Sequence, residues 1–298
     1  IVDTKLSKFE VYEDLFPSRN EGVNAWVSIM RGCDKFCTFC IVPFTRGRER
    51  SRPVSSIIKE IEIAVMNGFV EITLLGQNVN SYTSPDGDFV FLLEEVAKIK
   101  GVERIRYTSP HPKDMNEDLL KVMVKYDNIC NYIHLPLQAG SNRILKKMNR
   151  TYTREEFLSL VSMIRSYMPD SSISTDIIVG FPGETEEEYE ETLDIIKMVQ
   201  FDFAYMFKYS SRPGTKASEY TDHIKEIVKQ ERLSKLIKIQ NQIRSNVNKT
   251  RIGSVQKVLI EKESKKSELF WSGRTEGNIL TIVKKNNEKV KDIIDVVI

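Results

Sequence analysis

Short apolar segments alternate with amphipathic segments along most of this 298-residue chain, and no other feature constrains the fold as strongly. The apolar segments are rich in Ile, Val, Tyr or Phe, as buried parallel strands are. We expect strands at residues 26–30, 71–75, 104–108, 132–135, 172–179 and 203–208. The amphipathic segments between them predict helices at residues 55–66, 91–99, 116–125, 154–166 and 185–199.

Repeated strand–helix units predict a parallel sheet with right-handed crossovers. The six units expected here are too few for a complete eight-stranded barrel. The expected fold class is therefore α/β, built as a partial (βα)6 barrel of the TIM type. Functional residues are expected in the loops at the C-terminal ends of the strands, where such folds gather their sites.

The sequence changes character after the sixth expected strand. A long polar helix is expected from about residue 224 to 249, and short alternating runs after Gly253 predict a small all-β domain. The chain begins at Ile1 rather than Met and ends in a strand-like run, which indicates a fragment of a longer protein. The expected divisions are a linker at 1–23, a barrel core at 24–222, a linker helix at 223–249 and a truncated β domain at 250–298.

The net charge of +2 hides an uneven distribution. From His223 to the end, 17 Lys and Arg residues stand against nine Asp and Glu residues, so the rest of the chain is acidic. A basic tail on an acidic body favours a polyanionic partner such as RNA, and a solvated lysine-rich surface is the alternative. No apolar run approaches the ~18 residues that span a bilayer, so the sequence predicts no membrane span.

Three of the four cysteines form a cluster, with Cys33, Cys37 and Cys40 spaced C-x3-C-x2-C directly after the first expected strand. Iron–sulfur clusters are held by cysteine thiolates, and a loop this tight can place three thiolates on one face of a cubane. Three local ligands leave the fourth iron open. Structural zinc has four ligands, usually in two separate pairs, so zinc and ordinary buried thiols are the weaker alternatives. The few cysteines indicate a reducing, cytoplasmic setting, and Cys130 is expected to be a core thiol.

Polar loops follow other expected strands, where parallel strands bring their C-terminal ends together. Phe39, just before the last cysteine, can pack its ring on an adenine. The loop that begins at Gly76 allows close approach of the backbone, and its amides and hydroxyls can hydrogen-bond a zwitterion. Ordinary loop packing or a plain polar turn is the alternative at each position. His134 is expected to be a core residue whose ring nitrogens are hydrogen-bonded within the protein. The candidate cofactor-binding residues are Phe39, Gly76, Gln77, Asn78, Gln138, Ser141 and Asp176.

Basic residues are concentrated in two segments. Alternating arginines follow the cysteine loop, where they can bind phosphates, pair with neighbouring acids or form a solvated face. Bases mixed with aromatics in the last segment suit RNA, which combines stacking with phosphate contact; core aromatics with edge lysines are the alternative. The candidate RNA-binding residues are Arg46, Arg48, Lys265, Lys266 and Arg274.

Together these motifs resemble the radical SAM (S-adenosylmethionine) methylthiotransferases, and in particular the branch that modifies isopentenylated adenosine in tRNA. The terminal β segment resembles the TRAM domain, a small RNA-binding barrel found in that family. The resemblance extends from about residue 24 to 220. The matching segments are residues 32–52, 75–82, 134–141, 176–185 and 209–215.

The resemblance implies a radical SAM barrel in which Cys33, Cys37 and Cys40 hold a [4Fe–4S] cluster and SAM binds the open iron. It implies the addition of a methylthio group to C2 of N6-isopentenyladenosine next to the tRNA anticodon. Related enzymes act on threonylcarbamoyl-adenosine or on a ribosomal-protein aspartate, and the loop at 76–80 and the arginines at 46–52 favour the first branch. An RNA-binding module with a structural cluster is the alternative of another class.

One departure from the family pattern concerns sulfur delivery. The family carries an N-terminal domain whose three further cysteines hold a second [4Fe–4S] cluster, and residues 1–23 are too short for it. We therefore expect the chain to bind SAM and RNA without completing thiolation by itself. The expected partners are a tRNA anticodon stem–loop and an electron donor such as a flavodoxin or ferredoxin, for a cytoplasmic monomer without a membrane association.

Overall fold

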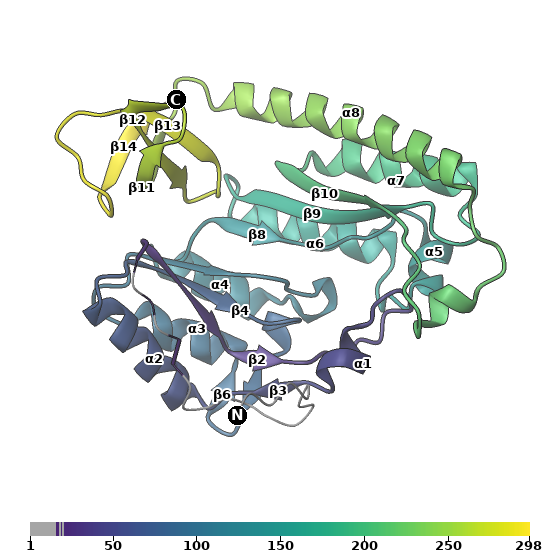
Figure 1. Cartoon of the computed structure of the whole chain (residues 1–298), viewed down its shortest axis with the longest axis horizontal. Coiled ribbons are helices and arrows are strands. Elements are labelled where there is room, and N and C mark those ends of the chain that lie inside the picture. Colours follow the sequence, from purple (N-terminus) through teal and green to yellow (C-terminus); the bar gives the residue numbers. More distant parts are fainter. Residues whose placement is uncertain (1–15, 18, 20) are drawn as a thin grey trace, which may run out of the picture.

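The computed structural model describes residues 16, 17, 19 and 21–298, so most of the expected linker at 1–23 lies outside the described residues (Figure 1). Six parallel strands form an incomplete barrel, which confirms the expected fold class. Each strand lies within two residues of its predicted position. They are β1 (Asn24–Ser28), β4 (Glu71–Leu75), β7 (Arg104–Tyr107), β8 (Tyr132–His134), β9 (Ser172–Val179) and β10 (Phe203–Lys208).

The barrel wall consists of two three-stranded sheets, ordered β1-β4-β7 and β10-β9-β8, rather than one continuous sheet. The sheets meet just before β8, where Ile105 forms a parallel bridge with Ile129 and accepts a hydrogen bond from the Cys130 amide at 2.9 Å. β8 has only three residues, and it pairs along its length with β9 alone. The arc is open between β1 and β10, which are the outer strands of the two sheets.

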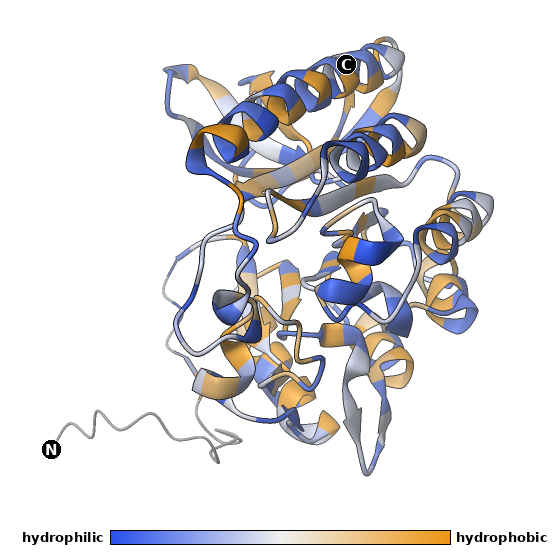
Figure 2. Ribbon diagram, turned by 90° about the vertical axis from the view of Figure 1, so that its right-hand side faces the viewer, coloured by the Kyte–Doolittle hydropathy of each residue, from blue (hydrophilic) through white to orange (hydrophobic). Residues whose placement is uncertain are grey.

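Helices cover the convex side of the barrel, and their apolar residues alternate with hydrophilic ones along each ribbon (Figure 2). The predicted helices are present with shifts of one or two residues at their ends. The start of α3 differs because the Asp88 carboxylate caps the helix by accepting from the Phe91 amide. The helices are α2 (Val54–Met66), α3 (Phe89–Ala97), α4 (Glu117–Lys125), α6 (Arg154–Tyr167), α7 (Glu186–Val199) and α8 (Glu226–Thr250).

Several short elements were not predicted, because each is too brief to show a periodic pattern. Two small hairpins and two short helices belong to this group, and both short helices lie in the loops that follow barrel strands. They are β2 (Met30–Arg31) with β3 (Arg50–Ser51), β5 (Thr83–Ser84) with β6 (Gly87–Asp88), α1 (Val42–Arg46) and α5 (Asn142–Lys147). Three 3-10 turns complete the set, at Val79–Ser81, Pro112–Asp114 and Lys216–Glu219.

Helix α8 leads into a four-stranded antiparallel sheet, the β domain, which confirms the predicted all-β segment. Its strands are ordered β13-β12-β11-β14. The strands are β11 (Val255–Ser264), β12 (Ser267–Thr275), β13 (Leu280–Lys284) and β14 (Ile293–Val297). Only Val258, Leu259 and Ile260 are fully buried apolar residues in this domain, so much of its stability must come from docking against the barrel.

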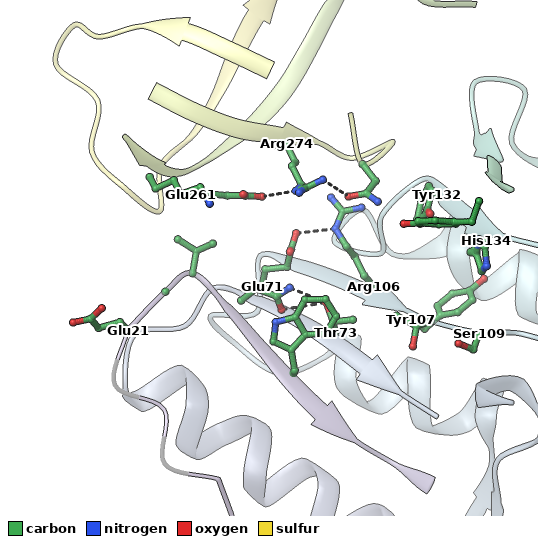
Figure 3. Close-up of a pocket in the computed structure, with 18 residues that line it drawn as sticks. Glu21, Glu71, Thr73, Arg106, Tyr107, Ser109, Tyr132, His134, Glu261 and Arg274 are labelled. Atoms are coloured by element: carbon green, nitrogen blue, oxygen red, sulfur yellow. Dashed lines mark hydrogen bonds and ion pairs between the residues drawn. The ribbon is translucent and has the colours of Figure 1, made fainter. Parts of the chain in front are cut away.

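Two buried arginines of β7 dock the β domain at the N-terminal end of the barrel strands. Arg104 donates to the carbonyl oxygens of Arg274 at 2.6 Å and Lys257 at 2.9 Å. Arg106 donates to the carbonyls of residues 275 and 276 at 2.8 and 2.9 Å and pairs with the Glu71 carboxylate at 2.9 Å (Figure 3). Neither contact was predicted from the sequence.

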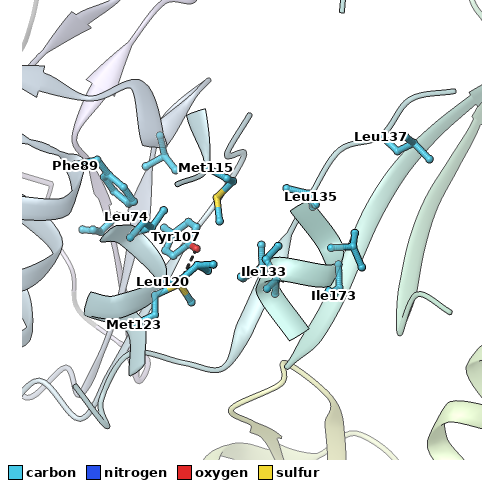
Figure 4. Packing of buried hydrophobic residues seen from close by; sticks show 14 of the residues in the cluster. Leu74, Phe89, Tyr107, Met115, Leu120, Met123, Ile133, Leu135, Leu137 and Ile173 are labelled. Carbon is cyan, nitrogen blue, oxygen red and sulfur yellow. Dashed lines mark hydrogen bonds between the residues drawn. The ribbon is translucent and has the colours of Figure 1, made fainter. Parts of the chain in front are cut away.

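The hydrophobic core lies between the sheets and the helices. Leu74, Tyr107 and Leu120 are at most 4% exposed on the first sheet and its helices, and Ile133 and Ile173 are fully buried on the second (Figure 4). Burying one such side chain contributes about 1.5–3 kcal/mol, so the core fixes the wall from which the site loops extend. In the part of the chain that the structure describes, no helix has the length and apolar character needed to cross a membrane.

Candidate cofactor and substrate site

The cysteine loop leaves the barrel after β1 and is closed at its base by the β2–β3 hairpin. Gly32 has a φ of +76°, and a Cβ atom there would lie 2.0 Å from the Arg48 carbonyl oxygen. The amide of Cys33 donates to the Gly47 carbonyl at 3.2 Å. The tight return of the chain therefore requires a glycine at position 32, because a larger residue would clash with the opposite side of the loop.

The three loop thiols are free and partly buried. The pKa of Cys33 is raised to about 11, mainly by burial; a backbone hydrogen bond opposes the shift, and nearby Glu49, Cys37 and Cys40 contribute to it. Burial likewise raises the pKa of Cys40. Clustered thiols of this kind ionise when a metal centre replaces their protons and supplies the missing positive charge.

Among the described residues, no three His, Cys, Asp or Glu side chains close around a single metal ion. In a cubane each thiolate binds a different iron atom, so the sulfur atoms need not converge. The residues present therefore fit a [4Fe–4S] cluster, which Cys33, Cys37 and Cys40 would hold.

Arg150 is a site residue that sequence reasoning missed. Its Nη1 donates to Cys37 Sγ at 3.3 Å, its Nε to the Tyr152 hydroxyl at 2.9 Å and its Nη2 to the Pro136 carbonyl at 3.1 Å. Burial opposes its charge, yet the fields of Tyr152 and Cys37 leave its pKa raised. The residue lies 113 positions from Cys37 in the sequence, so no local spacing could have linked them.

The loop after β4 packs directly against the cysteine loop. A Cβ at Gly76 would lie 2.7 Å from the Met30 side chain, which explains the glycine there. Asn78 donates to the carboxylates of Asp114 at 2.9 Å and Glu49 at 3.4 Å, so its amide nitrogen is committed to the protein. The side-chain oxygens of Gln77 and Asn78 are buried without a partner among the described residues, which leaves two acceptors for a bound ligand.

The loops after β8 and β9 give the remaining candidates different roles. Gln138 has a φ of +74°, and its amide donates to the Asp176 carbonyl at 2.8 Å. Phe39 meets Phe181 edge to face at 6.5 Å, which leaves a partly buried ring next to Cys40. Ser141 is buried, and its hydroxyl donates to the carboxylate of residue 188 at 3.2 Å. This hydroxyl is therefore already hydrogen-bonded within the protein.

His134 is not the core residue that we expected, because it faces a cavity. Its Nε2 lies 3.3 Å from the Asp176 carboxylate and its Nδ1 lies 2.8 Å from the Ser174 hydroxyl. Tyr205 meets its ring edge to face at 5.7 Å. Both ring nitrogens have polar partners, as expected, but the side chain lies on the inner wall of the barrel and not in the hydrophobic core.

The cavity has a volume of about 730 Å³ and extends from the inner wall of the barrel to the β domain (Figure 3). Trp26 and Tyr205, on the two outer strands, line it and are 55% and 46% exposed to solvent. Exposed aromatic rings on rigid strands suit stacking with a planar base. The other lining side chains include Thr73, Arg106, Tyr132, His134, Glu261, Lys262, Arg274 and Asn278.

The candidate RNA-binding residues fall into two separate groups. Arg46 and Arg48 follow the cysteine loop, where Arg48 pairs with Asp34 at 2.6 Å. Lys265 and Lys266 form the β11–β12 turn, next to a groove of about 610 Å³ on the β domain. Arg274 reaches the cavity and pairs with Glu261 at 3.2 Å. The barrel lies between the two groups, and Arg274 is the one of these five residues that lines the cavity.

A family model described as the radical SAM superfamily matches residues 27–196, the segment from β1 to α7 that contains the cysteine loop. The chain belongs to the radical SAM superfamily. Members of this superfamily use a [4Fe–4S] cluster and SAM, and the fit of the three loop cysteines agrees with that cofactor.

Two curated relatives of this radical SAM chain share one name. A tRNA-2-methylthio-N(6)-dimethylallyladenosine synthase of Acetivibrio thermocellus is 50% identical over 281 residues, which cover 93% of this chain and 58% of the relative. One of Carboxydothermus hydrogenoformans is 46% identical over 299 residues, covering 99% of this chain and 68% of the relative. The resemblance to the methylthiotransferases is confirmed, and the chain spans roughly three fifths to two thirds of these relatives' length.

Solved structures share the fold at low sequence identity. A radical S-adenosylmethionine methyltransferase of Kitasatospora setae, with cobalamin and a [4Fe–4S] cluster bound, has a TM-score of 0.56 at 18% identity, covering 66% of this chain and 39% of that chain. Coproporphyrinogen III oxidase of Escherichia coli has a TM-score of 0.55 at 13% identity, covering 89% and 72%. These likenesses support the partial barrel and carry no argument about the substrate.

Proposed function

We propose that this chain provides the catalytic and RNA-binding part of an enzyme that adds a methylthio group to C2 of N6-isopentenyladenosine next to the tRNA anticodon. The observation that carries the proposal is a cavity that lies inside the barrel and is bounded on its other side by the basic β domain. The same barrel carries the three-cysteine loop after β1. The shared name of the relatives gives the substrate its chemical identity.

The proposal assigns separate tasks to separate residues. Cys33, Cys37 and Cys40 would hold a [4Fe–4S] cluster, which when it binds SAM supplies the electron that cleaves the sulfonium bond of SAM. The free acceptors of Gln77 and Asn78 would orient the amino group of SAM. Phe39, Gly76, Gln138 and Asp176 remain candidates for contacts with its adenosine and its amino-acid part.

The substrate adenosine would enter the cavity between the barrel and the β domain. Trp26 and Tyr205 would stack on bases, because both residues line the cavity and are substantially exposed to solvent. Lys265, Lys266 and Arg274 would contact phosphates along the β domain, which we take to be a TRAM-type module. We propose the same division of the chain as the sequence predicts, with the core at 24–222, the linker helix at 223–249 and the β domain at 250–298.

The cellular setting of the proposal follows from its chemistry. The four cysteines are free thiols, which favours a reducing cytoplasm. The enzyme would receive electrons from a flavodoxin or ferredoxin and act as a monomer on a tRNA anticodon stem–loop.

A binding experiment with RNA stem–loops tests the proposed substrate. The reconstituted chain with SAM is titrated with anticodon stem–loops that carry isopentenyladenosine, threonylcarbamoyl-adenosine or plain adenosine, and with a ribosomal protein. We expect the isopentenyl RNA to bind most tightly and to increase the yield of 5′-deoxyadenosine. Equal binding of all RNAs without that increase would favour an RNA-binding module with a structural cluster, and preference for the ribosomal protein would favour the protein-modifying branch.

A further inference from the structure

The segment that follows α5 is tied to the cysteine loop by two residues in a row. Asn149 has a φ of +59°, and its side-chain amide donates to the carbonyls of Lys35 and Phe36 at 3.0 Å each. The next residue, Arg150, reaches Cys37 Sγ at 3.3 Å. On the other side of Cys37, the Thr38 amide donates to the Met148 carbonyl at 3.0 Å. The loop and this segment are therefore held together on both sides of the Arg150–Cys37 contact.

Arg150 carries a charge that nothing in the described part of the chain neutralises. Its three hydrogen-bond partners are a thiol, a phenol hydroxyl and a backbone carbonyl, and none of the ion pairs among the described residues includes it. The hydroxyl of Tyr152 is itself committed, because it donates to the carbonyls of Pro136 and Leu137 at 2.9 Å each. A partly buried guanidinium without an anionic partner is unfavourable unless an anion occupies the adjacent space.

The superfamily's cofactor supplies that anion. A cubane of charge +2 with three thiolates carries one negative charge, and one-electron reduction adds a second. A cation that hydrogen-bonds a ligand sulfur stabilises the more negative state, because hydrogen bonds to the sulfurs and the local charge set the reduction potential of such clusters. Arg150 touches one of those sulfurs from a position that solvent screens only in part.

We propose that Arg150 is a positioning residue of the cluster site, which holds the Cys37 sulfur and raises the reduction potential of the cluster. The inference rests on the cluster assignment and does not depend on the RNA substrate. The electron comes from an external one-electron donor, and Arg150 neither gains nor loses a proton. Its effect is on the equilibrium between the oxidised and reduced cluster.

The test is a redox titration of the anaerobically reconstituted chain without SAM or RNA, followed by electron paramagnetic resonance. Arg150→Met is compared with Arg143→Met, a matched control in α5 whose guanidinium pairs with Glu188 at 2.6 Å. We expect Arg150→Met to be about tenfold harder to reduce, which is a midpoint ~59 mV more negative for one electron. Arg143→Met is expected to match the wild type, and Arg150→Lys, which keeps the charge, to recover most of the shift.

Three results would overturn the proposal. One is an Arg150→Met midpoint equal to that of the wild type and of Arg143→Met. Another is a shift that appears only after SAM is added, because Arg150 would then act on the SAM carboxylate. The third applies if Arg150→Met holds no iron, in which case Arg150→Gln is compared with Arg150→Lys. A lower midpoint or weaker iron binding in Arg150→Gln than in Arg150→Lys supports the role of the charge. Equal behaviour of these two variants refutes it.

Discussion

Replacing Arg106 with Met should be one of the most damaging single changes in the protein. The guanidinium pairs with Glu71 at 2.9 Å, and the two side chains are only 8% and 3% exposed. Removing one partner of a buried ion pair costs about 3–5 kcal/mol, because the other charge remains buried without compensation. The carbonyls of residues 275 and 276 also lose their donor. We therefore expect Arg106→Met to lower the free energy of unfolding by at least about 3 kcal/mol.

A double-mutant cycle measured by urea unfolding checks this magnitude. Removing both charges in Arg106→Met/Glu71→Leu should recover more than about 2 kcal/mol of the loss, since apolar side chains often replace a buried pair at little cost. Lys121→Met is the control, because this lysine and its partners are exposed and its removal should leave stability unchanged. The reasoning is refuted if Arg106→Met costs less than about 1 kcal/mol, or if the double variant is no more stable than the single one.

Three further predictions concern the loop, the pH response and the RNA. Gly32→Ala should abolish iron binding because of its clash at 2.0 Å, while Gly253→Ala, at φ +85° with open space around it, should keep a full cluster by iron assay. Burial holds the pKa of His111 well below 6.5, so its contribution to stability is present above that pH and is lost as the pH falls. Stability should drop by about 1.4 kcal/mol per pH unit below 6.5, and His111→Asn should remove that slope in urea unfolding at several pH values. Lys265→Ala with Lys266→Ala should weaken anticodon stem–loop binding and reduce the slope of log K against log salt by about two, one for each lysine, whereas an unchanged slope would contradict phosphate contacts there.

The sequence predicted the barrel well because the signals for its elements are local. A run such as β9, which contains three Ile, one Val and one Thr in eight residues, indicates a strand by its β-branched side chains. The capping box of α7, formed by Thr185 and Glu188, marks the start of a helix within four residues. The cysteine loop was equally accessible, since Cys33, Cys37 and Cys40 lie within eight residues and their spacing alone indicates a cluster.

The contacts that the sequence did not reveal join residues far apart in the chain. Arg104 finds its acceptor 170 residues away in the β domain, and arginines within a predicted strand give no sign of such a partner. Ser141 was a candidate for a ligand because of its loop, but its hydroxyl is taken up by Glu188 from another helix. His134 likewise depends on the curvature of the barrel, which decides whether a residue at the end of a strand faces the core or a cavity.

The most direct test of the account is the cleavage of SAM by the anaerobically reconstituted chain. The chain is mixed with SAM and a strong reductant, and 5′-deoxyadenosine is quantified beside a variant in which Cys33, Cys37 and Cys40 are all changed to Ala. The account predicts 5′-deoxyadenosine from the intact chain and none from the variant. An intact chain that holds a [4Fe–4S] cluster and binds SAM but forms no 5′-deoxyadenosine would contradict it.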